Sequence, residues 1–189
     1  MIKNLSKGSF MSTAVWKSFE ENSLTHSAAH YLMTIHELLD TQGYARVTDI
    51  AKRLNTTRGS CSISLKPLKK RGVIKEDENK FLSLSKEGKR LAEIVEHNGE
   101  LLETLFKNVL GVSPEQAEID ACKIEHLLSL ENSMALQNLI RFISSDKKVA
   151  KDFLKALRKE NNISCTHNAE ACEVCQTICF LETPKTKTG

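Results

Sequence analysis

Two short amphipathic segments separated by a polar turn constrain the fold of this chain more than any other feature of its sequence. Residues 47–54 place Ile50 and Leu54 on one helical face, and residues 58–71 form a second predicted helix. A polar turn at residues 55–56 joins the two segments. The succession of helix, tight turn and helix predicts a helix-turn-helix unit.

A β-hairpin is predicted directly after this unit. Gly72 ends the second helix, and the segments 73–75 and 81–84 contain branched and aromatic side chains that strands prefer. The charged turn at residues 76–80 joins these segments. The sequence therefore predicts a winged helix-turn-helix.

Helical periodicity continues on both sides of the winged unit. Ser113, Pro114 and Gln116 form a helix-start signal, with Ser113 as the N-cap and Gln116 in the position that completes a capping box. The other predicted helices span residues 23–40, 86–110, 131–143 and 146–160. The predicted fold class is mainly α, with an N-terminal winged helix-turn-helix followed by a helical domain.

Changes in the pattern of predicted helices and strands divide the chain into four parts. They are a flexible leader (residues 1–22), a winged helix-turn-helix domain (23–90), a helical domain (91–160) and a cysteine-rich tail (161–189). No apolar run approaches the ~18 residues needed to cross a bilayer, and the leader lacks the pattern of a signal peptide. We expect a cytoplasmic protein with no membrane partner.

Charge is segregated along the chain. Residues 45–90 carry 13 basic and five acidic side chains, a net charge of +8, whereas residues 91–145 carry three basic and nine acidic ones, a net charge of −6. The basic half suits a polyanion such as nucleic acid, and the acidic half suits a cation. A solvated surface of mixed charge is the alternative explanation for either run.

The segment 120–126 carries the strongest candidate for chemistry. Cys122, Glu125 and His126 stand at i, i+3 and i+4, which places a thiolate, a carboxylate and an imidazole on one face of a predicted helix. Such donors suit a transition-metal ion, and His30 on the first helix is the candidate fourth ligand. By spacing alone, a surface Glu-His pair beside a buried cysteine is the more common explanation.

Four segments, including residues 120–126, carry a resemblance to one family of regulators. They are His30-Tyr31, Leu84-Ser-Lys-Glu-Gly88, Leu101-Leu102-Glu103 and Asp120-Ala-Cys-Lys-Ile-Glu-His126. Together with the winged unit, they make residues 23–143 similar to the diphtheria-toxin-repressor and manganese-regulator family of metal-dependent transcriptional repressors. The resemblance implies a homodimer that binds a palindromic DNA operator when it holds a divalent metal, and a protein that is not an enzyme. It also implies that the helical domain, residues 91–160, is a metal-binding and dimerisation domain.

The resemblance also implies which residues hold the metal. His30, Cys122, Glu125 and His126 inherit the principal activating site, and Met33 stands where manganese sensors place a carboxylate. A thiolate with two imidazoles and one carboxylate suits Fe(II), which we expect, or Co(II) and Zn(II), better than Mn(II). Mn(II) is kept as a further candidate because the family includes manganese sensors.

The family's second metal site is only partly present. Glu103 matches it, but Gly99 replaces a helix histidine, and Glu118 stands where the iron sensors have another histidine. We expect this second site to be missing rather than rearranged.

The second helix of the winged unit is expected to enter the major groove of DNA. The predicted contacts, from this helix and from neighbouring basic side chains, are Thr57, Arg58, Ser60, Ser62, Ser64, Lys66 and Lys80. An exposed helix face without DNA contacts is the alternative for any one serine.

Two other residues of the second helix carry structural expectations. We expect Cys61 to pack against the preceding helix, and Pro67 to kink the second helix or end it early, because proline removes a backbone hydrogen bond.

The tail carries four of the six cysteines, and in a cytoplasmic chain this favours metal or redox chemistry over disulfides. The candidate ligands are Cys165, Cys172, Cys175 and Cys179, with His167 as a substitute for one of them. Their spacing is close to that of a loop that holds a [4Fe–4S] cluster, and a zinc site fits about as well. A redox-active dithiol and an inert tail are the alternatives. A winged-helix regulator that senses redox state or iron–sulfur clusters through this tail is the competing function.

Overall fold

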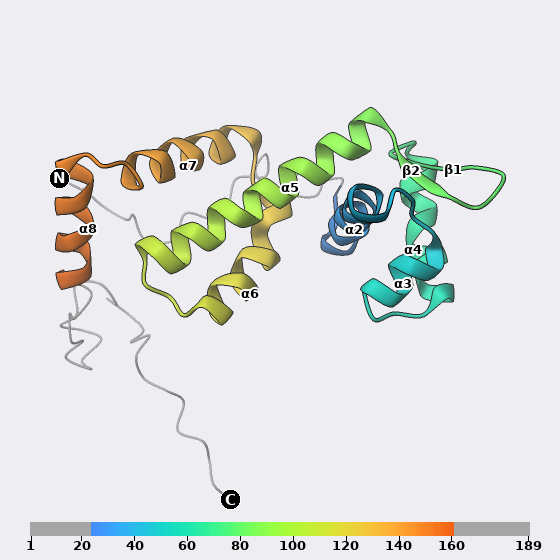
Figure 1. Cartoon of the computed structure of the whole chain (residues 1–189), viewed down its shortest axis with the longest axis horizontal. Helices are drawn as coiled ribbons and strands as arrows, with labels where there is room; N and C mark the ends of the chain where they lie inside the picture. Colours follow the sequence, from blue (N-terminus) through green and yellow to red (C-terminus); the bar gives the residue numbers. More distant parts are fainter. Residues whose placement is uncertain (1–23, 161–189) are drawn as a thin grey trace, which may run out of the picture. The chain divides into compact units, whose positions relative to one another are not determined.

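The computed structural model describes residues 24–160, so the predictions for the leader and for the cysteine-rich tail lie outside the described residues. The chain divides into two compact units with a boundary between Arg141 and Phe142. The first unit holds the winged helix-turn-helix. In the described part of the second unit, residues 142–160, one helix is complete, α8 (Lys148–Glu160), which is labelled in Figure 1. Within residues 24–160, no helix combines the length and the apolar composition needed to span a membrane.

Helices α3 (Val47–Arg53) and α4 (Arg58–Lys70) form the predicted helix-turn-helix. Asn55 in the turn adopts a left-handed conformation, with φ at 49°, which asparagine tolerates better than most residues. The Thr57 hydroxyl caps α4 by accepting a hydrogen bond from the backbone N–H of Ser60 at 3.1 Å. The local sequence therefore determines both the turn and the start of the second helix.

One face of α4 enters the main hydrophobic core. Cys61, Leu65 and Leu68 are buried there, as expected for Cys61. The expectation that Pro67 ends α4 early is wrong, because the helix continues through it to Lys70, and the alternative, a kink at Pro67, stays a prediction. Burying a leucine stabilises the fold by about 1.5–3 kcal/mol, so the two leucines that flank Pro67 offset its cost of about 3 kcal/mol in a helix.

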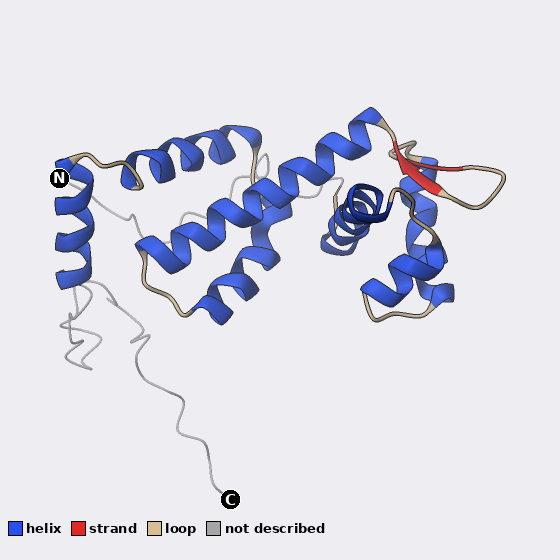
Figure 2. Ribbon diagram, viewed as in Figure 1, coloured by secondary structure: helices blue, strands red, loops and turns tan. Residues whose placement is uncertain are grey.

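Strands β1 (Ile74–Glu76) and β2 (Leu82–Leu84) pair in antiparallel fashion and form the predicted wing (Figure 2). In the turn between them, Asp77 Oδ1 accepts a hydrogen bond from the backbone N–H of Phe81 at 2.8 Å. An isolated bridge joins β2 to Ala45, in the loop before α3. The wing is therefore attached to the helical part of the winged unit at its base.

Two longer helices organise the rest of the first unit. Helix α2 (His26–Gln42) packs against α5 (Lys86–Thr104) and also contacts α4 and β2. Helix α6 (Pro114–Ile124) packs on α5 as well. The Ser85 hydroxyl caps α5 by accepting the N–H of Gly88 at 3.1 Å, as expected for an N-cap. Figure 1 shows α5 extending from the wing past α2 to α6.

The last turn of the helix predicted at residues 86–110 is π-helical rather than α-helical. This turn, η1, spans Leu105–Val109, and the N–H of Leu110 bonds to the carbonyl of Leu105 at 3.0 Å. Gly111 follows with φ at 74° and ends the helix, as glycine can adopt this conformation at little cost.

Gly88 lies where α5 meets the backbone of the wing. A Cβ at this position would collide with the carbonyl group of Val73. We expect Gly88→Ala to lower the free energy of unfolding by about 1–3 kcal/mol, the range for overpacked sites. Gly59→Ala is the matched control, because its Cβ would meet nothing closer than Thr57 Oγ1 at 3.9 Å. Equal stability of the two variants in urea unfolding would contradict this tight contact.

Helix α6 starts at the predicted residue, but only half of the expected capping box forms. Ser113 Oγ accepts the N–H of Gln116 at 3.3 Å, whereas the Gln116 side chain donates to Asp120 Oδ2 at 2.9 Å instead of returning to the cap. A 3-10 turn, η2 (Glu125–Leu127), follows α6, and α7 (Leu130–Ile143) comes next.

Candidate metal centre

Side chains from α2 and α6 meet beside α5. His30 Nε2 lies 3.2 Å from Cys122 Sγ, although the two residues are 92 positions apart in the sequence. Both helices pack on α5, and this shared contact holds the two side chains together. The structure therefore brings together two of the four residues predicted to hold the principal metal.

His26, which the sequence pattern did not indicate, belongs to the same group. One donor atom from each of His26, His30 and Cys122 lies within 4.8 Å of the other two. The rings of His26 and His30 make an edge-to-face contact with their centroids 4.4 Å apart. Histidines at i and i+4 share one side of a helix, and this spacing was the available signal in the sequence.

The predicted placement of Glu125 and His126 on the same α-helical face as Cys122 is wrong. Helix α6 ends at Ile124, so both residues lie in the 3-10 turn η2. His126 nevertheless lies next to the group, with its ring centroid 5.3 Å from that of His26. Its Nδ1 is buried and has no hydrogen-bond partner within the described part of the chain.

The Glu125 carboxylate lies against Gly99 of α5. A Cβ built on Gly99 would be 2.5 Å from Glu125 Oε2, so the carboxylate occupies space that any larger residue at position 99 would need. Glu125 is only 5% exposed. Among the residues that the structure describes, it is not part of the group within 4.8 Å formed by His26, His30 and Cys122.

A buried asparagine holds the backbone of turn η2. Asn98 Nδ2 donates to the carbonyl of Glu125 at 2.9 Å, and Asn98 Oδ1 accepts a hydrogen bond from Ser133 Oγ at 2.6 Å. Asn98 is 1% exposed and Ser133 is 5% exposed, so both bonds are shielded from water. They connect η2 to α5 and to α7.

Burial controls protonation at this centre. It lowers the pKa of His30 and of His126, and the neighbouring His26 lowers both further. Burial also raises the pKa of the Cys122 thiol, with a smaller contribution from Glu125, and it raises the pKa of Glu125 to about 7. Both imidazoles are therefore neutral at neutral pH and keep a lone pair for a metal, whereas a cation must displace the proton on Cys122.

The remaining predicted ligands do not join the group. Met33 is partly buried and packs against the hydrophobic core. Glu103 pairs with Lys107 at 3.8 Å. Burial and Glu125 raise the pKa of the Cys122 thiol, and Glu118 raises it further. In the part of the chain described, however, Glu118 adds no donor to the group. Their roles as ligands stay predictions.

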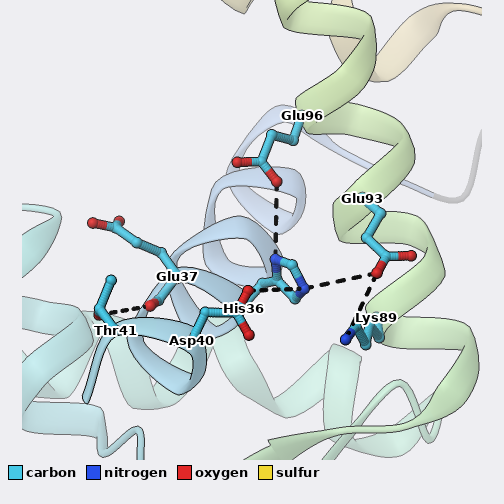
Figure 3. A network of polar contacts seen from close by, with 7 residues as sticks. All are labelled: His36, Glu37, Asp40, Thr41, Lys89, Glu93 and Glu96. Carbon is cyan, nitrogen blue, oxygen red and sulfur yellow. Dashed lines mark hydrogen bonds and ion pairs between the residues drawn. The ribbon is translucent and has the colours of Figure 1, made fainter. Parts of the chain in front are cut away.

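A separate polar network joins α2 to α5 farther along these helices (Figure 3). His36 Nε2 lies 3.6 Å from Asp40 Oδ2 and 3.9 Å from Glu93 Oε1, while its Nδ1 lies 3.9 Å from Glu96 Oε2. Lys89 in turn pairs with Glu93 at 3.8 Å. The network adds polar contacts between α2, which carries two of the metal-type donors, and α5, on which α6 packs.

A basic groove with a volume of about 500 Å³ lies between α4 and the wing. Arg46, which was not among the predicted contacts, places its guanidinium carbon 4.2 Å from the ring centre of Phe81 beside this groove. Three predicted DNA contacts, Arg58, Ser62 and Lys80, line the groove. The cationic side chains that line it are Arg46, Arg58, Lys69 and Lys80.

The other predicted DNA contacts have different surroundings. The Thr57 hydroxyl caps α4 and also donates to Ser60 Oγ at 2.9 Å, so these two side chains are engaged with each other. Ser64 lines a different cavity, together with Pro67. Lys66 is exposed on α4. DNA binding by each of these residues stays a prediction.

A winged helix-turn-helix with a basic groove, joined to helices that carry metal-type donors, defines a metal-dependent DNA-binding regulator. Comparison with known families agrees with this class. Residues 23–81 match the iron dependent repressor N-terminal DNA binding domain, and residues 85–154 match the iron dependent repressor metal binding and dimerisation domain.

Similar proteins identify the family. The chain is 30% identical to the HTH-type transcriptional regulator MntR of Oceanobacillus iheyensis, over 77% of this chain and 98% of that protein. It is 31% identical to the regulator of the same name from Bacillus subtilis, over 72% of this chain and 94% of that protein. The chain therefore belongs to the diphtheria-toxin-repressor and manganese-regulator family of metal-dependent transcriptional repressors. Proteins of this family are regulators rather than enzymes, and the competing redox or iron–sulfur function is not favoured.

Solved structures share the fold. The crystal structure of T. acidophilum IdeR is 27% identical, with a TM-score of 0.50, over 61% of this chain and 54% of that chain. The manganese regulator SloR is 22% identical, with a TM-score of 0.54, over 60% of this chain and 53% of that chain. The chain thus spans about half the length of these two structures. The predicted fold class, a winged helix-turn-helix followed by a helical metal-binding and dimerisation domain, is confirmed.

Proposed function

We propose that this chain represses transcription as a homodimer, and that it binds a palindromic operator when His30, Cys122, Glu125 and His126 hold a divalent ion. The observation that carries this proposal is the 3.2 Å contact between His30 and Cys122, because it joins two metal-type donors from helices far apart in the sequence. The DNA-binding and dimerisation regions that the family models describe support the operator and the homodimer. The family role also supports a cytoplasmic location.

The residues of the site suit a transition-metal ion. A thiolate, imidazoles and a carboxylate are ligands that such ions accept, and metal ligation would satisfy the buried Nδ1 of His126. When bound, the ion supplies a cross-link between α2 and α6. Helix α2 also contacts α4, the expected recognition helix, so a fixed position of His30 constrains α4. This contact is the physical route by which metal affinity and DNA affinity become coupled.

We propose Fe(II) as the ion that acts in the cell. Cys122 supplies sulfur, and Met33 stands in place of a carboxylate, so the site offers fewer of the oxygen ligands that Mn(II) prefers. Co(II), Zn(II) and Mn(II) are the competing candidates. The tail cysteines and His167 stay a predicted second site, for a cluster or zinc, outside the described residues.

Metal-dependent DNA binding by the full chain tests this proposal. The probe is a DNA duplex selected from a randomised pool in the presence of Co(II), an air-stable substitute for Fe(II). Fluorescence anisotropy should show an affinity about 5–150-fold higher with the ion than without it, the usual range of coupling between two sites, and a chelator should reverse the effect. Equal affinity with and without each candidate ion would reject the proposal.

Arg58→Ala and Lys80→Ala should each weaken binding to the same duplex, because both cations line the basic groove. If each contacts one phosphate, each substitution should reduce the slope of log K against log salt concentration by about 1. Lys107→Ala is the matched control, since Lys107 pairs with Glu103 on a different part of the unit. A salt slope that is the same in all three variants and in the wild type would contradict phosphate binding in the groove.

A further inference from the structure

His26 occupies the first position of α2, one helical turn before His30. It is exposed, whereas His30 and Cys122 are partly buried, so it is the most solvent-accessible member of the donor group. Its ring contacts two other imidazoles, with centroid distances of 4.4 Å to His30 and 5.3 Å to His126. The resemblance to the repressor family assigns no role to this position.

The donor spacing around His26 is close to what one ion requires. Bonds from Zn(II) to nitrogen and sulfur are about 2.0–2.3 Å, so two ligands of one ion lie about 3.3–3.8 Å apart. The donors of His26, His30 and Cys122 lie within 4.8 Å of one another, and His30 Nε2 lies 3.2 Å from Cys122 Sγ. Small rotations of an exposed histidine side chain are enough to complete such an arrangement.

Glu125 differs from the three residues of this group. Its carboxylate lies in the space beside Gly99, and within the described residues it is absent from the group that the histidines form with Cys122. An asparagine bond to its backbone carbonyl further fixes the turn that carries it. The donors that are closest together are therefore two nitrogens and one sulfur, with His126 next to them.

We propose that His26 is a ligand of the regulatory ion, and that His26, His30 and Cys122 form a nitrogen-and-sulfur set that disfavours Mn(II) relative to Fe(II), Co(II) and Zn(II). This inference rests on the proposed metal-dependent function and concerns the same site. Imidazole and thiolate ligands suit ions such as Zn(II), whereas Mn(II) favours carboxylates, carbonyls and water. Each imidazole that takes the place of an oxygen ligand therefore shifts selectivity away from Mn(II).

Co(II) titration of the full chain, followed by absorption spectroscopy, tests the inference. The four tail cysteines are replaced by serine in every sample, so that a thiolate-to-cobalt charge-transfer band reports on Cys122. Cys122→Ser should remove that band. His26→Ala should keep the band but change the ligand-field bands, because the number of nitrogen ligands falls by one.

Affinities from chelator competition give the selectivity. His26→Ala should lower the affinity for Zn(II) and Co(II) by about 10–100-fold or more, the range seen when a supporting group of a metal site is lost, and should leave the affinity for Mn(II) nearly unchanged. His97→Ala is the matched control, because His97 is a half-exposed histidine that pairs with Glu100 on α5. Thermal unfolding of both variants checks that the fold is intact.

The outcomes separate the inference from the proposed function. If His26→Ala binds Co(II) with wild-type spectra and an unchanged ratio of Zn(II) to Mn(II) affinity, the inference is wrong, while a band that depends on Cys122 still supports the metal site. If the wild type shows no band that depends on Cys122 and no metal-dependent DNA binding, the proposed function itself fails. The inference is supported if His26→Ala loses affinity for Zn(II) and Co(II) but not for Mn(II), and if His97→Ala loses neither.

Discussion

Replacing Cys122 by serine together with His126 by alanine is expected to abolish the metal dependence of DNA binding. The double variant loses the Cys122 sulfur that contacts His30 and the imidazole whose buried Nδ1 has no hydrogen-bond partner among residues 24–160. Loss of two proposed ligands should lower metal affinity by far more than the roughly 10–100-fold effect of losing a supporting group. In a metal titration followed by fluorescence anisotropy, DNA affinity should stay at the metal-free value throughout.

The control for this experiment separates the helical site from the tail. Replacement of Cys165, Cys172, Cys175 and Cys179 by serine should leave metal-dependent DNA binding unchanged if the helical site is the sensor. The opposite pattern, in which the tail variant loses the response and the Cys122→Ser/His126→Ala variant keeps it, would make the tail the sensor. That result would overturn the proposed function in favour of the competing one.

Asn98→Ala is expected to have the largest effect on stability among single substitutions near the site. Asn98 is 1% exposed and bonds to both Glu125 and Ser133, so its loss leaves a buried carbonyl and a buried hydroxyl without a partner. An unsatisfied buried group costs about 1–3 kcal/mol, and we expect the free energy of unfolding in urea to fall by about 2–3 kcal/mol. Metal affinity should fall by about 10–100-fold, because Asn98 holds the turn that carries Glu125 and His126.

Two further variants show whether this effect comes from the hydrogen bonds. Ser133→Ala removes one of the two bonds and should cost about 1 kcal/mol. Asn132→Ala changes an exposed asparagine on α7, the helix that carries Ser133. It should alter stability by no more than about 0.5 kcal/mol. If Asn98→Ala were as stable as Asn132→Ala and bound metal equally well, Asn98 would have no part in supporting the centre.

The fold was predictable because its signals are local. Apolar spacing, N-caps at Thr57, Ser85 and Ser113, and glycines at helix ends act within a few residues of the chain. The errors arose where local rules compete with packing or with other hydrogen bonds. Pro67 is tolerated because the leucines beside it are buried, and Gln116 bonds to Asp120 rather than to its cap.

The site was only partly predictable, because its donors come from separate elements. The family resemblance indicated His30 and Cys122, and the structure brings them to 3.2 Å. His26 was missed because the resemblance assigns its position no role, although its i, i+4 spacing to His30 is visible in the sequence. The position of Glu125 depends on where α6 ends and on the space beside Gly99, and spacing along a helix reports neither.

The most direct test of the central claim is to measure metal affinity with and without bound DNA. Coupling between two sites is reciprocal, so the ion that tightens DNA binding must itself bind more tightly to the DNA complex, by the same factor. We predict equal factors for Co(II) and the selected duplex in the wild type, and no coupling in the Cys122→Ser/His126→Ala variant. Metal affinity that is the same in the presence and absence of DNA would contradict the claim that this centre controls DNA binding.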